Sequence, residues 1–290
     1  MPLVWQTPAD WRKSAGELFG KNTGYSAKTV VWFPACRGGT QKSKKHVASC
    51  SFGKDSVASL LLAREHGEPL DEAVYCEVMF DRTVSGEVPE HRDFIYGTAI
   101  PTLERMGIKI VVLRSEKTYV DLFTGRITRG PKKGMLRSFP ICGRCAVQRD
   151  CKMKPLEKYG RTLPPDTVRY IGIAHDEQER LLRLNGTKVS LLDKYGYTEQ
   201  DARQLCEQAG LLSPVYAFTD RGGCWFCPNA KRRELRHLYD YHPDLWARML
   251  ELQALPGKVS EKFNRTQKFS DIDEMFRWED AQTVLPEKIA

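Results

Sequence analysis

Hydrophobic positions along the chain predict strands that alternate with helices from His46 onward. Four short apolar runs have the length and composition of buried strands, at residues 46–50, 71–80, 108–116 and 167–177. Between them, residues 57–67 and 89–107 carry helical periodicity, which Pro101 interrupts in the second segment. Elements in this order form a parallel sheet through right-handed crossovers. We therefore expect an α/β fold with a doubly wound, mainly parallel sheet, whose ligands lie at the carboxyl ends of the strands.

Two regions outside this pattern flank the predicted sheet. Residues 1–45 show little periodicity and end in the basic run RGGTQKSKK, which predicts a basic N-terminal extension. From residue 231 the sequence becomes helical and amphipathic, which predicts a helical C-terminal region at 231–290. The chain therefore divides into three expected parts, with a sheet domain at 46–230 between the two flanks.

Composition and charge limit the classes of protein that fit. The chain has 290 residues with 45 Lys+Arg against 37 Asp+Glu, a formal net charge of +8. This balance suits a polyanionic partner, although a basic protein that binds only a nucleotide would show it too. No segment approaches the ~20 apolar residues that span a bilayer, and the first residues lack the charged-then-apolar order of a secretory signal. We expect a cytoplasmic protein with no membrane partner.

The segment SFGKDS, residues 51–56, lies where the first strand ends and the first helix begins. Its small residues let the backbone approach a phosphate, and the amides at a helix start form an anion site. Lys54 adds a positive charge and Ser56 adds a hydroxyl. The segment lacks the G-x-x-x-x-G-K-S/T pattern of a Walker loop. It predicts a nucleotide-binding loop, and an ordinary strand-to-helix turn with an N-capping side chain is the alternative.

This loop resembles the PP-loop, S-x-G-x-D-S, of the adenine nucleotide alpha hydrolase superfamily. That superfamily includes ATP pyrophosphatases, ATP sulfurylase small subunits and phosphoadenosine phosphosulfate (PAPS) reductases. Residues 80–95 are similar to the D-T-G-x-E-x-P-E-T segment of the sulfurylase and PAPS reductase branch. They match it at Asp81, Thr83, Gly86, Glu87, Pro89 and Glu90. Arg82 and the extra residues between Thr83 and Gly86 depart from that pattern.

Two later segments resemble further motifs of the same family, in the same order. Residues 151–159 are similar to its L-K-x-x-P segment, which makes Lys152 the expected basic residue beside the phosphates. Residues 171–181 resemble G-x-R-x-x-E-S-x-x-R, with Glu177 and Arg180 matching and the first Arg replaced. The resemblance covers roughly residues 46–230 and implies ATP or a related adenine nucleotide, with Mg²⁺ on its phosphates. The nucleotide-binding residues that it implies are Ser51, Phe52, Gly53, Lys54, Asp55, Ser56, Asp81, Glu87 and Glu177.

Five of the nine cysteines are clustered and predict a metal site. They form a C-x2-C-x5-C segment and a C-x2-C pair, at Cys142, Cys145, Cys151, Cys224 and Cys227. Two intervening residues let both thiolates reach one metal, and the spacing suits zinc and a four-iron four-sulfur (4Fe-4S) cluster equally. The other four cysteines are interpreted as packed or incidental thiols.

The family resemblance favours the 4Fe-4S cluster over zinc. Iron-sulfur adenylylsulfate reductases carry similarly placed cysteines, and the match is direct for Cys224 and Cys227. DNA phosphorothioation sulfur-transfer proteins and some tRNA thiolases also combine a PP-loop with such a cluster. Cys142 and Cys145 are the preferred partners of this pair. Cys151 is either a further ligand or a free thiol beside Lys152.

These motifs together predict an ATP-dependent enzyme that adenylates an acceptor and then transfers sulfur to it. Asp55 belongs to the loop, and Lys54, Lys152 and Arg180 would stabilise charge on the phosphates. Sulfur would be carried on the cluster or on Cys151, and would come from a cysteine desulfurase or another donor. The acceptor is expected to be a nucleic acid, held by basic segments at 37–45, 128–137 and 231–238. A homodimer is a further possible assembly.

Two other functions remain open from the sequence. A PAPS or adenylylsulfate reductase would use a cysteine on a C-terminal tail, but the chain has no cysteine after Cys227, so Cys151 would have to take that role. A zinc-stapled nucleic-acid-binding regulatory module explains the charge and the cysteines but gives Asp55, Glu87 and Arg180 no purpose. Among the histidines, His175 is a candidate substrate contact at a strand end. We interpret His46, His91, His237 and His242 as structural.

Overall fold

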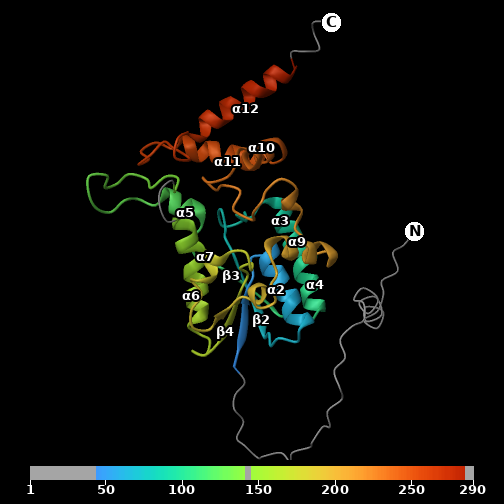
Figure 1. Cartoon of the computed structure of the whole chain (residues 1–290). Coiled ribbons are helices and arrows are strands. Elements are labelled where there is room, and N and C mark those ends of the chain that lie inside the picture. Colours follow the sequence, from blue (N-terminus) through green and yellow to red (C-terminus); the bar gives the residue numbers. More distant parts are fainter. Residues whose placement is uncertain (1–43, 141–144, 285–290) are drawn as a thin grey trace, which may run out of the picture. The chain divides into compact units, whose positions relative to one another are not determined.

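A five-stranded parallel sheet lies at the centre of the sheet domain (Figure 1). The computed structural model describes residues 44–140 and 145–284. The strands are β1 (His46–Ser49), β2 (Glu72–Glu77), β3 (Ile110–Arg114), β4 (Val168–Ile171) and β5 (Lys188–Val189). Every neighbouring pair is parallel, in the order β3-β2-β1-β4-β5. The prediction of an α/β fold with a parallel sheet is confirmed.

Four of these strands lie within the predicted apolar runs. All six residues of β2 are buried, as expected for a central strand of a sheet that is covered on both faces. The sequence pattern does not predict β5, because two residues are too few to show a period. The strand order reverses at β1, which has β2 on one side and β4 on the other. Ligands of such sheets bind at the carboxyl ends of the strands beside this reversal.

Helical segments connect the strands and continue beyond the sheet. Those between β1 and β4 are α2 (Lys54–Glu65), α3 (Pro89–Phe94), η1 (Ile95–Ala99), α4 (Ile100–Arg105), α5 (Tyr119–Thr124), η2 (Gln148–Met153) and α6 (Lys154–Gly160). Those after β4 are α7 (Gln178–Leu181), α8 (Leu191–Lys194), α9 (Glu199–Gln208), η3 (Pro214–Ala217), α10 (Arg232–Tyr241), α11 (Pro243–Ala254) and α12 (Phe269–Val284). Pro101 is accommodated because the π-helical turn η1 changes the hydrogen-bond register just before it.

Helices cover both faces of the sheet. α2, α4 and α9 lie on one side and α6 lies on the other (Figure 1). The first hydrophobic core fills the space between β1, β2 and α2, and fully buried Val57, Leu60 and Leu62 anchor α2 in it. The start of α2 is therefore held firmly against the carboxyl end of β1, where the predicted nucleotide loop lies.

A second hydrophobic core joins the C-terminal helices to loops of the sheet domain. It contains Phe80, which follows β2, and Tyr119 from α5, together with Trp246 from α11 and Phe276 from α12. The predicted helical C-terminal region thus packs on the chain segments that leave β2 and β3. The boundary at residue 230 stays a prediction, because both sides of it contribute to this core.

The predicted N-terminal extension falls almost entirely outside the described residues, and so does the basic run at 37–45 except for its last two residues. In the part of the chain that the structure describes, none of the helices combines the length and the apolar character needed to cross a bilayer.

Candidate functional site

The predicted nucleotide loop connects β1 to α2 and is fixed by hydrogen bonds of its own. Ser56 Oγ accepts from the amide of Ser51 at 3.2 Å and donates to the carbonyl of Gly53 at 2.9 Å. The amide of Lys54 donates to Tyr216 Oη at 2.9 Å. These two hydrogen bonds of Ser56 fix the shape of the loop, so its hydroxyl is already bonded within the protein.

Phe52 holds the loop from the opposite side. Its backbone lies in the left-handed region, at φ 58°, which is unusual for a residue other than glycine. Its ring is 1% exposed and meets Tyr75 edge-on, with 5.0 Å between ring centroids. Such strain persists only where the surrounding packing enforces it. The sequence places Phe52 among the nucleotide-binding residues, and the structure places its side chain in the first core.

A cavity of about 350 Å³ lies beside this loop. It is within the range of small-molecule sites. The predicted residues that line it are Ser51, Gly53, Lys54, Asp55, Glu87, Cys145, Lys152, Arg180, Cys224 and Cys227. The four segments that resemble family motifs and the two cysteine segments therefore all contribute residues to one cavity, as the strand order predicts.

Lys54 and Asp55 form an ion pair at the edge of this cavity. Lys54 Nζ lies 2.9 Å from Asp55 Oδ1 and 3.0 Å from Glu199 Oε2. Burial would lower the pKa of Lys54, but the two carboxylates raise it above its usual value. Burial also raises the pKa of Asp55, against the opposing effect of Lys54. Lys54 therefore carries its charge, and a bound phosphate would compete with Glu199 for it.

Glu87 is a cavity carboxyl group whose pKa is shifted upward. Burial raises its pKa to about 6, although the charge of Lys152 opposes this shift. Tyr75 Oη donates a hydrogen bond to Glu87 Oε1 at 3.2 Å. A carboxyl group with such a pKa can accept or release a proton near neutral pH.

Arg180 and Glu177 act as a pair. The guanidinium of Arg180 hydrogen-bonds to Glu177 Oε1, and the amide of Ala174 donates to Glu177 Oε2 at 3.1 Å. Arg180 lines the cavity, whereas Glu177 is not among its lining residues. The structure thus gives Glu177 the role of positioning Arg180 at the end of β4.

Asp81 is not among the residues that line the cavity. Its Oδ1 accepts from the amides of Thr83 and Val84, both at 2.7 Å, and its other oxygen pairs with Arg248 of α11. Burial opposes the shift, but these hydrogen bonds lower the pKa of Asp81 to about 2. Asp81 therefore shapes the turn after β2 and fastens it to the C-terminal region.

Three of the five clustered cysteines share the cavity with the nucleotide loop. They are Cys145, Cys224 and Cys227. The amide of Cys227 donates to the carbonyl of Cys224 at 3.0 Å, so the pair lies on one tight turn. A guanidinium nitrogen of Arg221 lies 3.7 Å from Cys227 Sγ. Cys142 lies outside the described residues.

Cys151 is buried in the second core and does not line the cavity. Its carbonyl accepts a weak hydrogen bond from Cys76 Sγ at 3.5 Å. Burial raises the pKa of the Cys151 thiol to about 11, which leaves it protonated near neutral pH. The expected nucleophile or ligand at this position is thus an enclosed thiol in this structure.

The cysteine pair is attached directly to the motif that follows β2. Glu87 and Cys224 form an antiparallel bridge, and the amide of Trp225 donates to the carbonyl of Gly86 at 3.1 Å. A side chain at Gly86 would lie 2.8 Å from the carbonyl of Val78 and 3.0 Å from the ring of Phe226. Only glycine permits this close approach.

The sequence named neither Tyr216 nor Glu199 as a site residue, and it indicated a structural role for His91; all three line the cavity. Tyr216 and Glu199 contact Lys54, as described above, and come from η3 and α9. His91 Nδ1 lies 2.8 Å from Ser213 Oγ, and its Nε2 lies 3.3 Å from the carbonyl of Ser51. Burial lowers the pKa of His91 to about 4, so the ring is neutral and supports the loop. One indication in the sequence that His91 lies near the site is that it directly follows Glu90 of a matched motif.

No family model and no curated protein matches the chain. One similar solved structure is the U34-tRNA thiolase NcsA from Methanococcus maripaludis with its [4Fe-4S] cluster, at 14% sequence identity. The similarity covers 80% of this chain and 81% of that chain, with a TM-score of 0.38.

Proposed function

We propose that this protein uses ATP to adenylate an acceptor and then replaces the adenylated oxygen with sulfur. One observation carries the proposal: a single cavity is lined by the nucleotide loop, by Lys54, Lys152 and Arg180, and by three cysteines. Cationic side chains at a helix start are suited to phosphates, and thiols are suited to a metal cluster. Neither a simple nucleotide sensor nor a zinc staple needs both in one cavity.

The phosphates of ATP would lie at the start of α2. Lys54, Lys152 and Arg180 line the cavity beside this position and would stabilise charge that develops on the phosphates. Asp55 is the loop carboxylate available to Mg²⁺ on those phosphates. In the first step an oxygen of the acceptor bonds to the α-phosphorus, the bridging bond to the β-phosphate breaks, and pyrophosphate leaves with the electron pair. Glu87 would accept the proton that the acceptor loses.

The second step replaces AMP with sulfur. A sulfur nucleophile at the oxidation level of sulfide bonds to the acceptor carbon, the carbon–oxygen bond breaks, and AMP leaves with the electron pair. This exchange requires no change in oxidation state. A cluster held by Cys145, Cys224 and Cys227, with Cys142 as a further expected ligand, would supply an iron site for sulfide from an external donor. Persulfide sulfur from a cysteine desulfurase would first have to be reduced by two electrons, with an external thiol as the reductant.

The spacing of the described cysteines favours a cluster over a single zinc ion. A tetrahedral zinc with Zn–S bonds of about 2.3 Å holds its sulfur atoms about 3.8 Å apart. Among the described residues, no three cysteine sulfurs lie within 4.8 Å of one another. Cysteines that bind separate iron atoms of one cluster stand farther apart than those of a zinc site, and the three described thiols line one cavity.

A nucleic acid is the acceptor class that the surface favours. The segment 128–137 is mostly exposed, and its cations Arg129, Lys132 and Lys133 make no ion pair with described residues. The cations of α10 differ, because Arg232 pairs with Glu279 and Arg233 pairs with Asp220. The predicted phosphate contacts of segment 128–137 are therefore available, while those of 231–238 are already used within the protein.

The reductase alternative gains no support from the structure. It needs a mobile or cavity-facing cysteine, and the remaining candidate, Cys151, is enclosed in the second core.

Adenylation and sulfur transfer can be distinguished by measuring pyrophosphate release and sulfur incorporation in the same anaerobic reaction. Wild-type protein incubated with ATP, an RNA acceptor and sulfide should release pyrophosphate and incorporate sulfur. Lys152→Ala should lose both, with pyrophosphate release falling by about 100-fold or more, since one lost charge contact to a transition state costs about this much. Cys224→Ser should keep pyrophosphate release and lose sulfur incorporation.

Lys158→Ala provides the matched control, because Lys158 is exposed and does not line the cavity. It should behave as wild type in both measurements. Pyrophosphate release that survives Lys152→Ala, or sulfur incorporation that survives Cys224→Ser, would contradict the proposal.

A further inference from the structure

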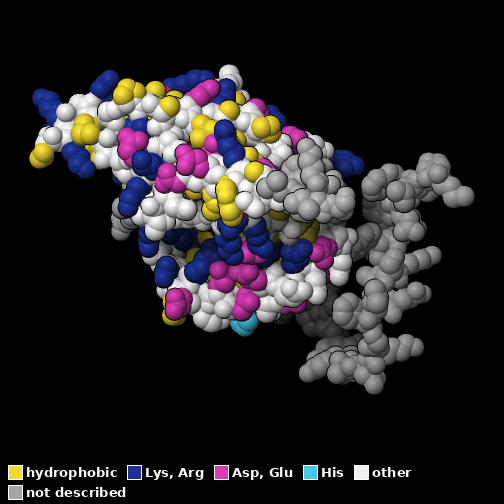
Figure 2. Space-filling view, turned by 90° about the horizontal axis from the view of Figure 1, so that it is seen from above, with side chains coloured by type: hydrophobic (Ala, Val, Ile, Leu, Met, Phe, Trp, Pro, Cys, Tyr) yellow, Lys and Arg dark blue, Asp and Glu magenta, His cyan; other side chains and the backbone are white. Residues whose placement is uncertain are grey.

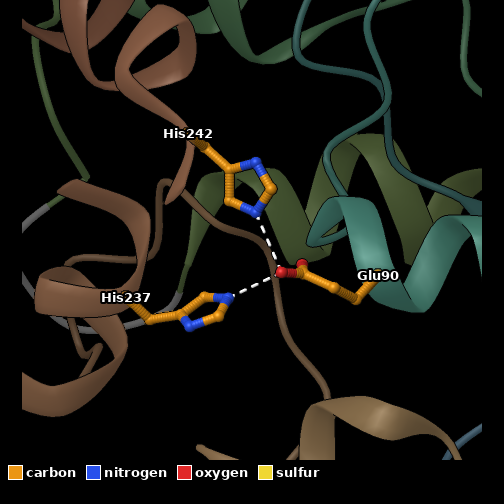
Figure 3. A group of neighbouring side chains, drawn as sticks. All are labelled: Glu90, His237 and His242. Atoms are coloured by element: carbon orange, nitrogen blue, oxygen red, sulfur yellow. Dashed lines mark hydrogen bonds and ion pairs between the residues drawn. The ribbon is translucent and has the colours of Figure 1, made fainter. Parts of the chain in front are cut away.

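Three side chains that no motif connects meet at one point outside the cavity. Glu90 comes from α3, His237 from α10, and His242 from the junction of α10 and α11 (Figure 3). His237 Nε2 lies 2.6 Å from Glu90 Oε1, and His242 Nε2 lies 3.0 Å from the same oxygen. Among the described residues, this is the group of three metal-binding atoms found within 4.8 Å of one another.

The second oxygen of Glu90 has no partner. Glu90 Oε2 is buried and makes no hydrogen bond with any described residue. A buried carboxylate oxygen without a partner costs about 1–3 kcal/mol or more, so proteins rarely leave one in that state. An ion, or a water bound to an ion, beside this carboxylate would satisfy it.

The two imidazole rings are held in the orientation that a metal ligand needs. Both Nε2 atoms point toward Glu90 (Figure 3). Phe218 stacks on the ring of His237, with 3.6 Å between centroids and an interplanar angle of 10°. Pro243 directly follows His242 and fixes the backbone where α11 begins. Rings that are fixed in this way lose little freedom when they bind an ion.

The spacing is close to that of a zinc site with two histidines and one glutamate. Zinc binds such ligands at about 2.0–2.2 Å, so neighbouring donor atoms of a tetrahedral site lie about 3.3 Å apart. The observed separations are 2.6 and 3.0 Å. A shift of less than about 1 Å in either ring would bring the donor atoms to the separations of a tetrahedral zinc site.

We propose that Glu90, His237 and His242 bind one zinc ion or a similar divalent transition-metal ion, with water in the fourth position. Two imidazoles and a carboxylate are the ligand set that suits such ions, whereas Mg²⁺ and Ca²⁺ prefer oxygen ligands. The site connects α3 to α10 and α11, and α3 directly follows the Glu87 bridge to Cys224. The ion therefore fastens the C-terminal region to the segment that carries the cysteine pair. This site is independent of the proposed sulfur transfer.

Zinc binding to full-length protein tests the proposal once the cysteine pair is removed. In a Cys224→Ser/Cys227→Ser background, metal-free protein should take up one equivalent of zinc, measured by elemental analysis after gel filtration. Adding Glu90→Gln or His242→Asn to this background should abolish that uptake. His66→Asn, at an exposed histidine on the far end of α2, should leave it unchanged. No uptake in the background, or full uptake after Glu90→Gln, would overturn the assignment.

Cobalt supplies a readout that a merely structural ion pair would not give. Co²⁺ at Glu90, His237 and His242 should produce visible d–d bands without the near-ultraviolet charge-transfer band of a cobalt–thiolate bond. Zinc should also raise the melting temperature of the background protein and leave that of its Glu90→Gln form unchanged, with circular dichroism confirming that both are folded. A cobalt spectrum that does not change on Glu90→Gln would place the ion elsewhere.

Discussion

At the scale of single residues, the site depends on charges that are held out of water. Lys54 is shared between Asp55 and Glu199, and Glu87 is enclosed beside Lys152. Because these side chains are partly buried, each of these charges acts on its neighbours more strongly than it would in open solvent. A nucleotide that enters the cavity meets groups whose protonation states are already set by the protein.

The pKa of Glu87 predicts how activity depends on pH. Burial raises this pKa to about 6, so the carboxylate that accepts a proton is present above that pH and is lost as the pH falls through it. The pH profile of kcat/KM for pyrophosphate release should therefore show an acid limb near pH 6. Glu87→Gln should lower the rate by about 100-fold or more and remove the limb.

The matched control for this profile is Glu116→Gln, at an exposed carboxylate outside the cavity. It should retain both the rate and the acid limb. An acid limb that persists unchanged in Glu87→Gln would assign the titration to another group.

At the scale of elements, two close backbone contacts bring the motifs together. Gly86 lets the chain after β2 pack against Phe226, which places the cysteine pair beside Glu87. Gly172, at the end of β4, lies against the first turn of α2, where an added Cβ would be 2.7 Å from the amide nitrogen of Ser56 and 2.8 Å from the carbonyl carbon of Asp55. Backbone atoms at such distances have to move.

Substitution of Gly172 should therefore damage the nucleotide loop more than the fold. Gly172→Ala should destabilise the protein by about 1–3 kcal/mol, the usual cost of overpacking, because it displaces the start of α2. The same displacement should weaken ATP binding by about tenfold or more, measured by calorimetry beside a thermal melt.

Gly97→Ala is the appropriate comparison, because no atom lies within 4 Å of the Cβ that it adds. It should bind ATP as wild type does. Equal ATP affinity in Gly172→Ala would show that the loop does not depend on this contact.

At the scale of the whole molecule, the C-terminal helices stand over the carboxyl end of the sheet (Figure 1). On the face that carries them, Lys and Arg side chains are spread among acidic ones rather than gathered in one field (Figure 2). Binding of a nucleic acid would then depend on the cations that are not already paired within the protein.

The salt dependence of RNA binding tests this distribution. The slope of log K against log salt should be steep for wild type, and Lys132→Ala/Lys133→Ala should reduce it by about 0.7–0.9 for each lysine removed. Lys231→Ala, whose lysine pairs with Asp220, should change it little. A slope near zero in wild type would favour a small-molecule acceptor, and equal changes in the two variants would contradict the role of segment 128–137.

Features that depend on residues close together in the sequence could be predicted from the sequence alone. The apolar runs predicted four of the five strands, because burial on both faces selects hydrophobic residues over a whole strand. The position of the loop at 51–56 followed from small and polar residues between a strand and a helix, and the tight turn of Cys224 and Cys227 followed from their spacing.

Only the tertiary structure decided which side chains meet. Phe52 points into the first core and Cys151 into the second, although both belong to segments that match a motif. Glu90 and His237 are separated by 147 positions in the chain and hydrogen-bond across the packed helices. The sequence thus determined the elements and the chemistry available to them, because these depend on local residue types. Folding decided which of those groups share a cavity, a core or an ion, because these depend on contacts between distant segments.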